Sequence, residues 1–204
     1  MLHRQAVAPA TLSLLKELMA LPALEHFYLV GGTALALQIG HRISVDLDFF
    51  CDHAHDQEAI LQQLPIPHTE FARSNVFLGC YVQGVKCDFV KYLFPLIEPL
   101  IVESGIRMAN PLEIAAMKLW AITRRGSKKD FIDLYFLLKK MSLQEMLTFF
   151  SQKFPTIEPF MVVRSLTWFE DAEEDFDPEM LLSVTWPAVK REIKHTVEKF
   201  MGEV

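Results

Sequence analysis

The sequence predicts an α+β fold, with a mixed β-sheet and flanking helices first and a C-terminal helical region after it. Short runs rich in β-branched and aromatic residues lie in the first half of the chain, whereas helix caps and helical spacing dominate after Asn110. We therefore expect residues 1–108 to form an α/β domain and residues 109–204 a helical domain.

The elements of the first half follow from periodicity. A helix is predicted over 9–21, because leucines recur at helical spacing until Pro22. A strand over 26–30 leads through a glycine turn into a helix of strong helix formers. The remaining predicted elements are a strand over 45–50, a helix over 56–64 and a hairpin of 75–82 with 85–92 around Gln83-Gly84.

The second half shows helix start signals. Asn110, Pro111 and Glu113 predict an N-cap, a first helical residue and an N3 glutamate, which open a helix through Thr123. Ser142 begins a second capping box. Further helices are predicted over 128–140, 161–169 and 186–201.

Composition limits the possible functions. Hydrophobic residues make up 51% of the 204 residues and charged residues 23%, which is typical of a folded globular protein. The net charge of −6 argues against a general nucleic-acid-binding surface, so any RNA contact must be local. Three widely spaced cysteines predict neither a disulfide framework nor a zinc site. With no signal peptide or membrane-spanning run, we expect a cytoplasmic protein.

Chemistry is concentrated in a glycine turn followed by paired aspartates. Gly31 and Gly32 at a helix N-terminus can present backbone N–H groups to a phosphate, and Thr33 can add a hydroxyl donor. Asp46 and Asp48 are two residues apart on a predicted strand, so both carboxylates share one face. Paired carboxylates together with substrate phosphates typically hold Mg²⁺.

Asp88, in a later strand, is the candidate for a third carboxylate of this site. The alternative is that Asp88 is an outward-facing residue of the hairpin, because its strand also alternates. Arg42 lies between the two motifs and is either a phosphate clamp or a solvated loop residue.

Four segments in order resemble a known family: LVGGTALAL at 29–37, GHRISVDLDFF at 40–50, KLWAIT at 118–123 and KDFIDL at 129–134. They are similar to the AbiEii/AbiGii toxins, the nucleotidyltransferase partners of bicistronic toxin–antitoxin (type IV) and abortive-infection systems. The resemblance implies a nucleotidyltransferase fold, with Mg²⁺ or Mn²⁺ as cofactor and an NTP as substrate. It also implies an RNA acceptor, with tRNA favoured, and a cognate antitoxin as partner.

The resemblance assigns roles to particular residues. Catalysis and metal binding fall to Asp46, Asp48 and Asp88, with Lys118 as a further catalytic residue that neutralises the triphosphate. The residues expected to bind the nucleotide or orient the groups around it are Gly31, Gly32, Thr33, Arg42, Thr123, Lys129, Asp130 and Asp133.

Other interpretations stay open at this point. Lys118 is alternatively a residue that snorkels from an amphipathic helix. The cations at 124–129 either contact RNA or complement a helix C-terminus, and the acidic stretch 170–179 is most simply a solvated loop. The acceptor is alternatively a protein or a small molecule, and the chain is alternatively a non-catalytic nucleotide-binding module.

Overall fold

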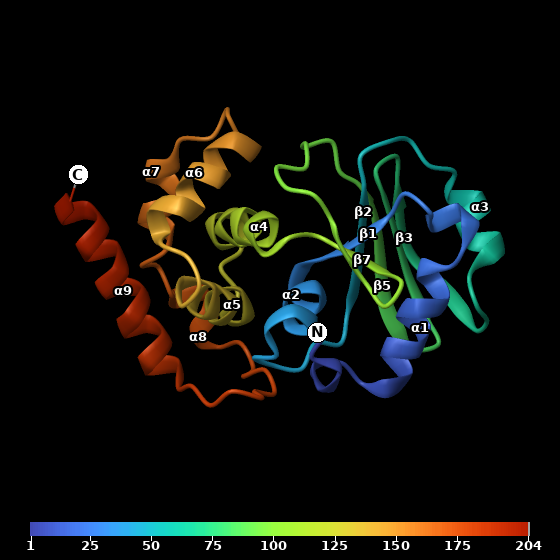
Figure 1. Ribbon diagram of the computed structural model, residues 1–204, viewed down its shortest axis with the longest axis horizontal. Helices are drawn as coiled ribbons and strands as arrows, with labels where there is room; N and C mark the ends of the chain where they lie inside the picture. Colours follow the sequence, from blue (N-terminus) through green and yellow to red (C-terminus); the bar gives the residue numbers. More distant parts are fainter. Residues whose placement is uncertain (204) are drawn as a thin grey trace. The chain divides into compact units, whose positions relative to one another are not determined.

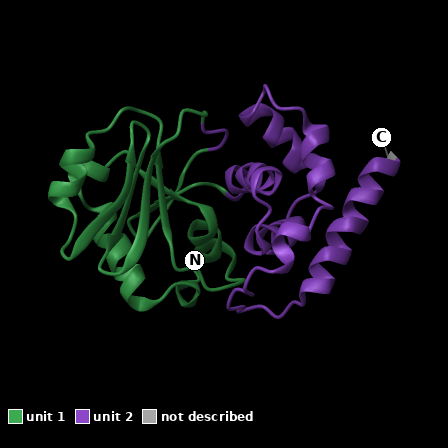
Figure 2. Ribbon diagram, turned by 180° about the vertical axis from the view of Figure 1, so that it is seen from behind, with its two compact units in different colours: residues 1–95, 99–110 green, residues 96–98, 111–204 purple. Residues whose placement is uncertain are grey.

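The computed structural model describes residues 1–203 (Figure 1). The chain divides into two compact units, which Figure 2 colours separately. The first unit contains residues 1–95 and 99–110, and the second contains residues 96–98 and the chain from residue 111 onward. The α+β architecture predicted from the sequence is confirmed.

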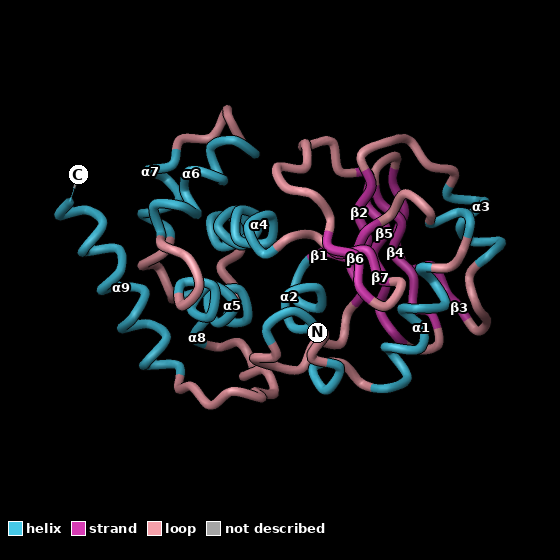
Figure 3. The backbone as a smooth tube through the Cα atoms, in the orientation of Figure 1, coloured by secondary structure: helices cyan, strands magenta, loops and turns pink. Residues whose placement is uncertain are grey.

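A seven-stranded mixed sheet forms the centre of the first unit, with the strand order β3-β4-β5-β2-β1-β7-β6. Figure 3 draws its strands in magenta. The central strand β2 pairs antiparallel with β1 and parallel with β5. The strands are β1 (Tyr28–Val30), β2 (Leu47–Cys51), β3 (His68–Ser74), β4 (Phe77–Val82), β5 (Val85–Lys91), β6 (Ile101–Glu103) and β7 (Ile106–Met108).

The sheet is larger than the sequence predicts. Strand β3 is a mostly exposed, polar edge strand, and β6 and β7 have three residues each, so none of them shows a clear alternation of apolar and polar residues. The predicted strand 45–50 is shifted, because β2 begins at Leu47 and Asp46 lies in the segment before it.

Local signals explain where the helices of this unit begin and end. The helix α1 starts with a proline at its first position, and the side chain of Asp56 caps α3 by accepting from the backbone N–H of Glu58. Gly40 ends α2 with φ of 68°, a left-handed conformation that glycine adopts without strain. These helices are α1 (Pro9–Met19), α2 (Gly31–Ile39) and α3 (Gln57–Gln63), with 3₁₀ turns at Arg4–Ala6 and Pro22–Leu24.

One face of the sheet centre is packed into the core. Phe49 on β2 and Phe89 on β5 are fully buried, and their rings stack with centroids 5.3 Å apart. Burying each ring contributes roughly 1.5–3 kcal/mol. Because side chains alternate along a strand, this packing directs Asp48 and Asp88 to the opposite face.

The second unit is helical. Its helices are α4 (Pro111–Arg124), α5 (Lys128–Leu138), α6 (Leu143–Lys153), α7 (Pro159–Ser165), α8 (Glu170–Glu173) and α9 (Trp186–Glu203). The predicted capping box at Ser142 is confirmed, with Glu145 bonded back to the Ser142 backbone. The helix predicted around 161–169 is found as α7, but it ends at Ser165, and residues 166–169 lie between α7 and α8.

Glu113 does not serve as a capping glutamate. Its buried carboxylate forms an ion pair of 2.6 Å with Lys153 and accepts from the backbone N–H groups of Ile97 and Glu98. A buried acid needs such partners to offset its desolvation. The pair therefore attaches the short segment 96–98 to α4 within the second unit.

Cys51, Cys80 and Cys87 are free and buried. Among the described residues, no helix combines the length and the apolar character that crossing a bilayer requires.

Candidate functional site

The candidate carboxylates meet on two neighbouring strands. Asp48 on β2 and Asp88 on β5 are paired in register, so their side chains lie next to each other on one face of the sheet. Asp46 lies two residues before Asp48, and both are partly exposed. The chain thus places two carboxylates side by side at the centre of the sheet from positions forty residues apart, and Asp46 lies in the segment that leads into β2.

Asp88 is not a solvated hairpin residue. Its side chain is only 15% exposed, and its Oδ1 atom is buried without a hydrogen-bond partner. Its other oxygen accepts from the Lys86 ammonium group. A buried, unsatisfied carboxylate oxygen is costly, so its presence beside two further carboxylates is typical of a site for a cation.

Lys86 is a member of this site that the sequence analysis did not single out. Burial disfavours its charge, but the Asp88 carboxylate and the charges of Asp48 and Asp46 outweigh this effect and raise the pKa of Lys86. The sequence feature that could have identified Lys86 is its separation of two residues from Asp88, which puts both side chains on the same face of β5.

The ion pair between Lys86 and Asp88 occupies one of the carboxylates that would bind a metal ion. In residues 1–203, no three histidine, cysteine, aspartate or glutamate side chains stand close enough together to hold a metal ion as they are arranged. The donor set nevertheless fits a divalent cation, because Asp46, Asp48 and Asp88 supply hard oxygens and Asp88 keeps one oxygen unsatisfied.

Gly31 is required by its backbone and by its neighbour. It adopts φ of 67° at the first position of α2, and a Cβ at this position would lie 2.5 Å from Oδ2 of Asp48. The absence of a side chain thus lets the Asp48 carboxylate approach the N-terminus of α2. This places backbone N–H groups and the positive end of the helix dipole beside the carboxylates.

Gly32 leaves room for the guanidinium group of Arg42. A Cβ at Gly32 would lie 2.2 Å from Nη2 of Arg42. Arg42 is 4% exposed and donates from Nη1 to the Ile43 carbonyl oxygen at 3.1 Å, so the solvated-loop interpretation of Arg42 is wrong. The glycine turn is therefore backed by a buried guanidinium group.

The structure corrects the role expected for Thr33. This residue is buried, and its hydroxyl donates to the Asp46 carbonyl oxygen and lies 2.8 Å from the Ser44 hydroxyl. Because the hydroxyl is engaged inside the protein, Thr33 holds the segment that carries Asp46 instead of pointing to a phosphate.

In the second unit, Lys118 forms a buried charge cluster with both predicted aspartates. Its Nζ atom lies 2.8 Å from Oδ1 of Asp130 and 2.5 Å from Oδ2 of Asp133. All three side chains are buried, so the snorkelling interpretation of Lys118 is wrong. Both charges on α5 are thus directed to one lysine on α4, which ties the two helices together.

Asp130 has two further partners. Ser127 donates to its Oδ2 atom at 2.6 Å, and Arg125 donates to the same oxygen at 3.0 Å. Burial disfavours the charged form, but Lys118 and Arg125 outweigh burial and lower the pKa of Asp130 to about 2. The cluster therefore contains a carboxylate that is ionised across the physiological range.

The two remaining predicted residues differ from each other. The hydroxyl of Thr123 donates to the Leu119 carbonyl oxygen at 2.9 Å within α4, so this hydroxyl is satisfied by its own helix. Lys129 is exposed on α5. Only Lys129 retains the accessibility that contact with a substrate requires.

The acidic stretch is not simply a solvated loop. Residues 170–173 form α8, and the buried Lys128 donates to the Asp175 carbonyl oxygen and pairs with Asp177 at 3.2 Å. Lys128 thus anchors the stretch and is unavailable to RNA. The basic cluster is thereby reduced to Arg124, Arg125 and Lys129, which are exposed.

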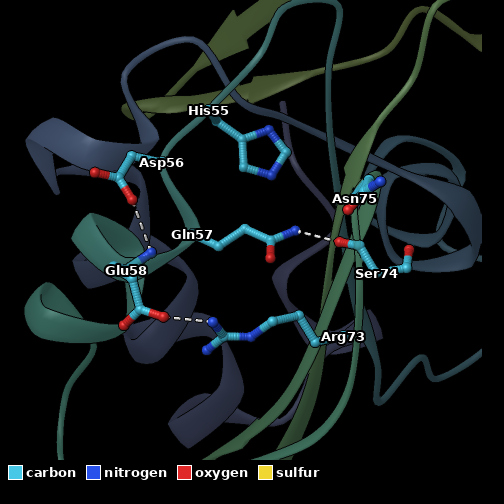
Figure 4. A pocket seen from close by; sticks show the side chains of 7 residues that line it. All are labelled: His55, Asp56, Gln57, Glu58, Arg73, Ser74 and Asn75. Carbon is cyan, nitrogen blue, oxygen red and sulfur yellow. Dashed lines mark hydrogen bonds and ion pairs between the residues drawn. The ribbon is translucent and has the colours of Figure 1, made fainter.

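A polar cavity of about 560 Å³ beside α3 is separate from these residues (Figure 4). Its polar groups already have partners within the lining: Glu58 binds Arg73, Asp56 accepts from the backbone N–H of Glu58, and Gln57 donates to the Ser74 carbonyl oxygen at 2.8 Å. None of the predicted site residues lines it. The cavity therefore does not take the place of the carboxylate site.

The chain matches a family model and a relative in sequence over most of its length. The family model described as "Nucleotidyl transferase AbiEii toxin, Type IV TA system" matches residues 13–66 and 84–202. The uncharacterized protein aq_aa25 of Aquifex aeolicus (strain VF5) is 34% identical over 195 residues, which cover 92% of this chain and 94% of that protein.

Solved structures share the fold. MenT4, a nucleotidyltransferase toxin of Mycobacterium tuberculosis H37Rv, matches with a TM-score of 0.56 and 16% identity, over 93% of this chain and 83% of that one. JHP933 from Helicobacter pylori matches with a TM-score of 0.52 and 16% identity, over 98% and 93% of the two chains.

The match to this family over most of the chain identifies a nucleotidyltransferase. The chain belongs to the AbiEii family of nucleotidyl transferase toxins, and the sequence-based assignment to this family is confirmed.

Proposed function

We propose that this nucleotidyltransferase moves a nucleoside monophosphate from an NTP to a hydroxyl of RNA, in a reaction that depends on Mg²⁺ or Mn²⁺. The observation that carries the proposal is the in-register pair of Asp48 and Asp88, with the buried, unsatisfied oxygen of Asp88. A packed core does not require this arrangement, whereas a divalent cation held by Asp48 and Asp88 would satisfy the buried oxygen and supply positive charge to the reacting phosphate.

The carboxylates would have distinct tasks. Asp46, Asp48 and Asp88 would hold the divalent cation, which when bound stabilises negative charge on the entering and leaving oxygens. To Asp88 we also assign the task of helping to deprotonate the attacking hydroxyl.

The triphosphate would bind at the glycine turn. Gly31 brings the backbone close to Asp48, and the guanidinium of Arg42 lies directly behind Gly32. Backbone donors and a fixed cation can neutralise charge as pyrophosphate departs, with little reorganisation during the reaction.

For the cluster in the second unit we propose a positioning role. Lys118 is neutralised by Asp130 and Asp133, so we assign it to fixing α4 against α5 instead of to direct contact with the triphosphate. Lys129, Arg124 and Arg125 are exposed cations in one short stretch, and we propose that they contact RNA phosphates.

The acceptor and the biological setting come from the family. AbiEii proteins are described as toxins of type IV systems, which supports a role as a toxin with a cognate antitoxin. For the acceptor we propose tRNA, and for the location the cytoplasm. Transfer to a protein or a small molecule is the competing outcome, and metal-dependent NTP binding without transfer would indicate a non-catalytic module.

The test is to incubate the purified protein with Mg²⁺ and each α-³²P-labelled NTP in turn, with total tRNA or a protein extract as acceptor. The control is the double variant Asp46→Ala/Asp48→Ala. We expect label on RNA that the double variant does not produce. Label on protein alone, or no label with any acceptor, would contradict the proposal.

A further inference from the structure

An exposed aromatic pair lies beside the carboxylates on the same face of the sheet. Gly79 on β4 is paired with Asp88, and Tyr81 is paired with Lys86. Paired residues of adjacent antiparallel strands direct their side chains to the same face. Tyr81 is therefore next to the ammonium group that binds Asp88, and the missing side chain of Gly79 leaves a space next to Asp88 itself.

The ring of Phe71 fills the space above Gly79. A Cβ at Gly79 would lie 2.6 Å from the Phe71 ring, so only glycine lets the ring lie across β4. Phe71 comes from β3, at the register shift between Glu70 and Ala72, and its ring centroid is 5.1 Å from that of Tyr81. Lys86 lies 5.7 Å from the Phe71 centroid.

The pair is accessible. Phe71 is 43% exposed and Tyr81 is 49% exposed, whereas the opposite face of the same strands is buried at Leu78 and Cys80. Core packing therefore does not account for the two rings. Two adjoining aromatic rings with a cation beside them suit a nucleobase and its phosphate, because every base can stack on a ring face.

The order of the strands separates this pair from the glycine turn. Gly31 follows β1, on one side of β2, whereas Phe71 and Tyr81 lie beyond β5 on the other side. In-line transfer requires the entering hydroxyl and the leaving pyrophosphate on opposite sides of the phosphorus. If the triphosphate binds at the glycine turn, the acceptor approaches from the side of Phe71 and Tyr81.

We infer that Phe71 and Tyr81 form a stacking platform for the unpaired terminal nucleotide of the RNA acceptor. This inference rests on the proposed function and specifies how the acceptor is held. Lys86 contributes the adjacent positive charge, so one lysine connects the carboxylates and the platform.

Binding is tested with a short single-stranded RNA that carries 2-aminopurine at its 3′ end, because stacking on a ring quenches this fluorophore. With Ca²⁺ present, we expect quenching by the wild type and a dissociation constant raised about 5- to 100-fold in Phe71→Ala/Tyr81→Ala. The conservative variant Phe71→Tyr should keep the quenching. The matched control is Phe160→Ala, which removes an aromatic side chain that is 62% exposed in α7 of the second unit.

Kinetics provide the second measurement. The platform variant should raise KM for RNA while KM for the NTP stays unchanged, because the triphosphate binds elsewhere. Unchanged quenching and unchanged KM for RNA in the platform variant would overturn the inference, even where transfer to RNA persists and the proposed function stands. Failure of the proposed function is seen separately, as an absence of labelled RNA with the wild type.

Discussion

Asp48 and Asp88 face each other in register on the parallel strands β2 and β5. The pairing brings two carboxylates together beside the N-terminus of α2, where Gly31 leaves room for one of them. Lys86 binds the other. The candidate site is therefore built from backbone register, a missing side chain and one internal cation, and each of these features can be altered separately.

Gly31→Ala should impair transfer by a specific clash. The substitution places a methyl group 2.5 Å from Oδ2 of Asp48 and strains a backbone at φ of 67°. Gly105→Ala is the matched control, because its φ is 79° and no atom lies within 4 Å of the added methyl group. Both variants should lose about 1–2 kcal/mol of unfolding free energy, measured by denaturant titration, from the left-handed backbone. Only Gly31→Ala should also lose transferase activity, and equal activity of the two variants would count against the predicted clash.

Lys86→Met should strengthen divalent cation binding. The ammonium group competes with a cation for the Asp88 carboxylate, so its removal should lower the Mn²⁺ dissociation constant roughly tenfold, measured by electron paramagnetic resonance. Lys91→Met is the control on the same strand. Lys91 is three residues from Asp88, so the alternation of side chains along β5 directs it to the opposite face. Weaker Mn²⁺ binding in Lys86→Met would show that Lys86 assists the cation instead of competing with it.

Asp130 should make the protein sensitive to acid. Its folded pKa of about 2 lies below the ordinary value of 3.8, so its contribution to stability is present above about pH 4 and is lost as the pH falls towards 2. The loss should amount to roughly 2 kcal/mol, discounting other groups. Denaturant titrations at a series of pH values should show this slope in the wild type and a smaller slope in Asp130→Asn.

Asp130→Asn should also lower the unfolding free energy at neutral pH. Asp130→Asn leaves the Lys118 charge only partly compensated in a buried place, which should lower the unfolding free energy by about 3–5 kcal/mol. Arg125→Gln changes a partner whose side chain is 64% exposed, so it should cost under about 1 kcal/mol. Similar losses for the two variants would contradict the assignment of Lys118 and Asp130 as a buried pair.

The sequence predicted those parts of the site that depend on local spacing. The alternation around Asp48 and around Asp88 was sufficient to expect two carboxylates on one face of the sheet, whereas Asp46, expected on the same strand as Asp48, lies before it. The role of Thr33 could not be predicted, because its partner, the Asp46 carbonyl oxygen, is a backbone atom that only the folded loop brings near. The ion pair between Glu113 and Lys153 likewise depends on how helices pack, which residue spacing along the sequence does not predict.

The fold was predictable where strands are buried on one face. Strand β3 was not predicted, because its residues are mostly exposed and polar. The sequence therefore shows no alternation of buried apolar and exposed polar residues there. This omission had a consequence for function, because β3 carries Phe71. The aromatic platform depends on the pairing of three strands and could not be inferred from any one of them.

The most direct test of the central claim is the rate of label transfer from an α-³²P-labelled NTP to RNA by the wild type, Asp48→Asn and Asp52→Asn. Asp52 is exposed directly after β2, so its variant is the matched control for a carboxylate lost from this region. Asp48→Asn should transfer label at least about 10³-fold more slowly, because it removes a ligand for the cation that stabilises the transition state. It should keep the wild-type circular dichroism spectrum, and Asp52→Asn should keep the wild-type rate. A folded Asp48→Asn protein that transfers label at the wild-type rate would contradict the account.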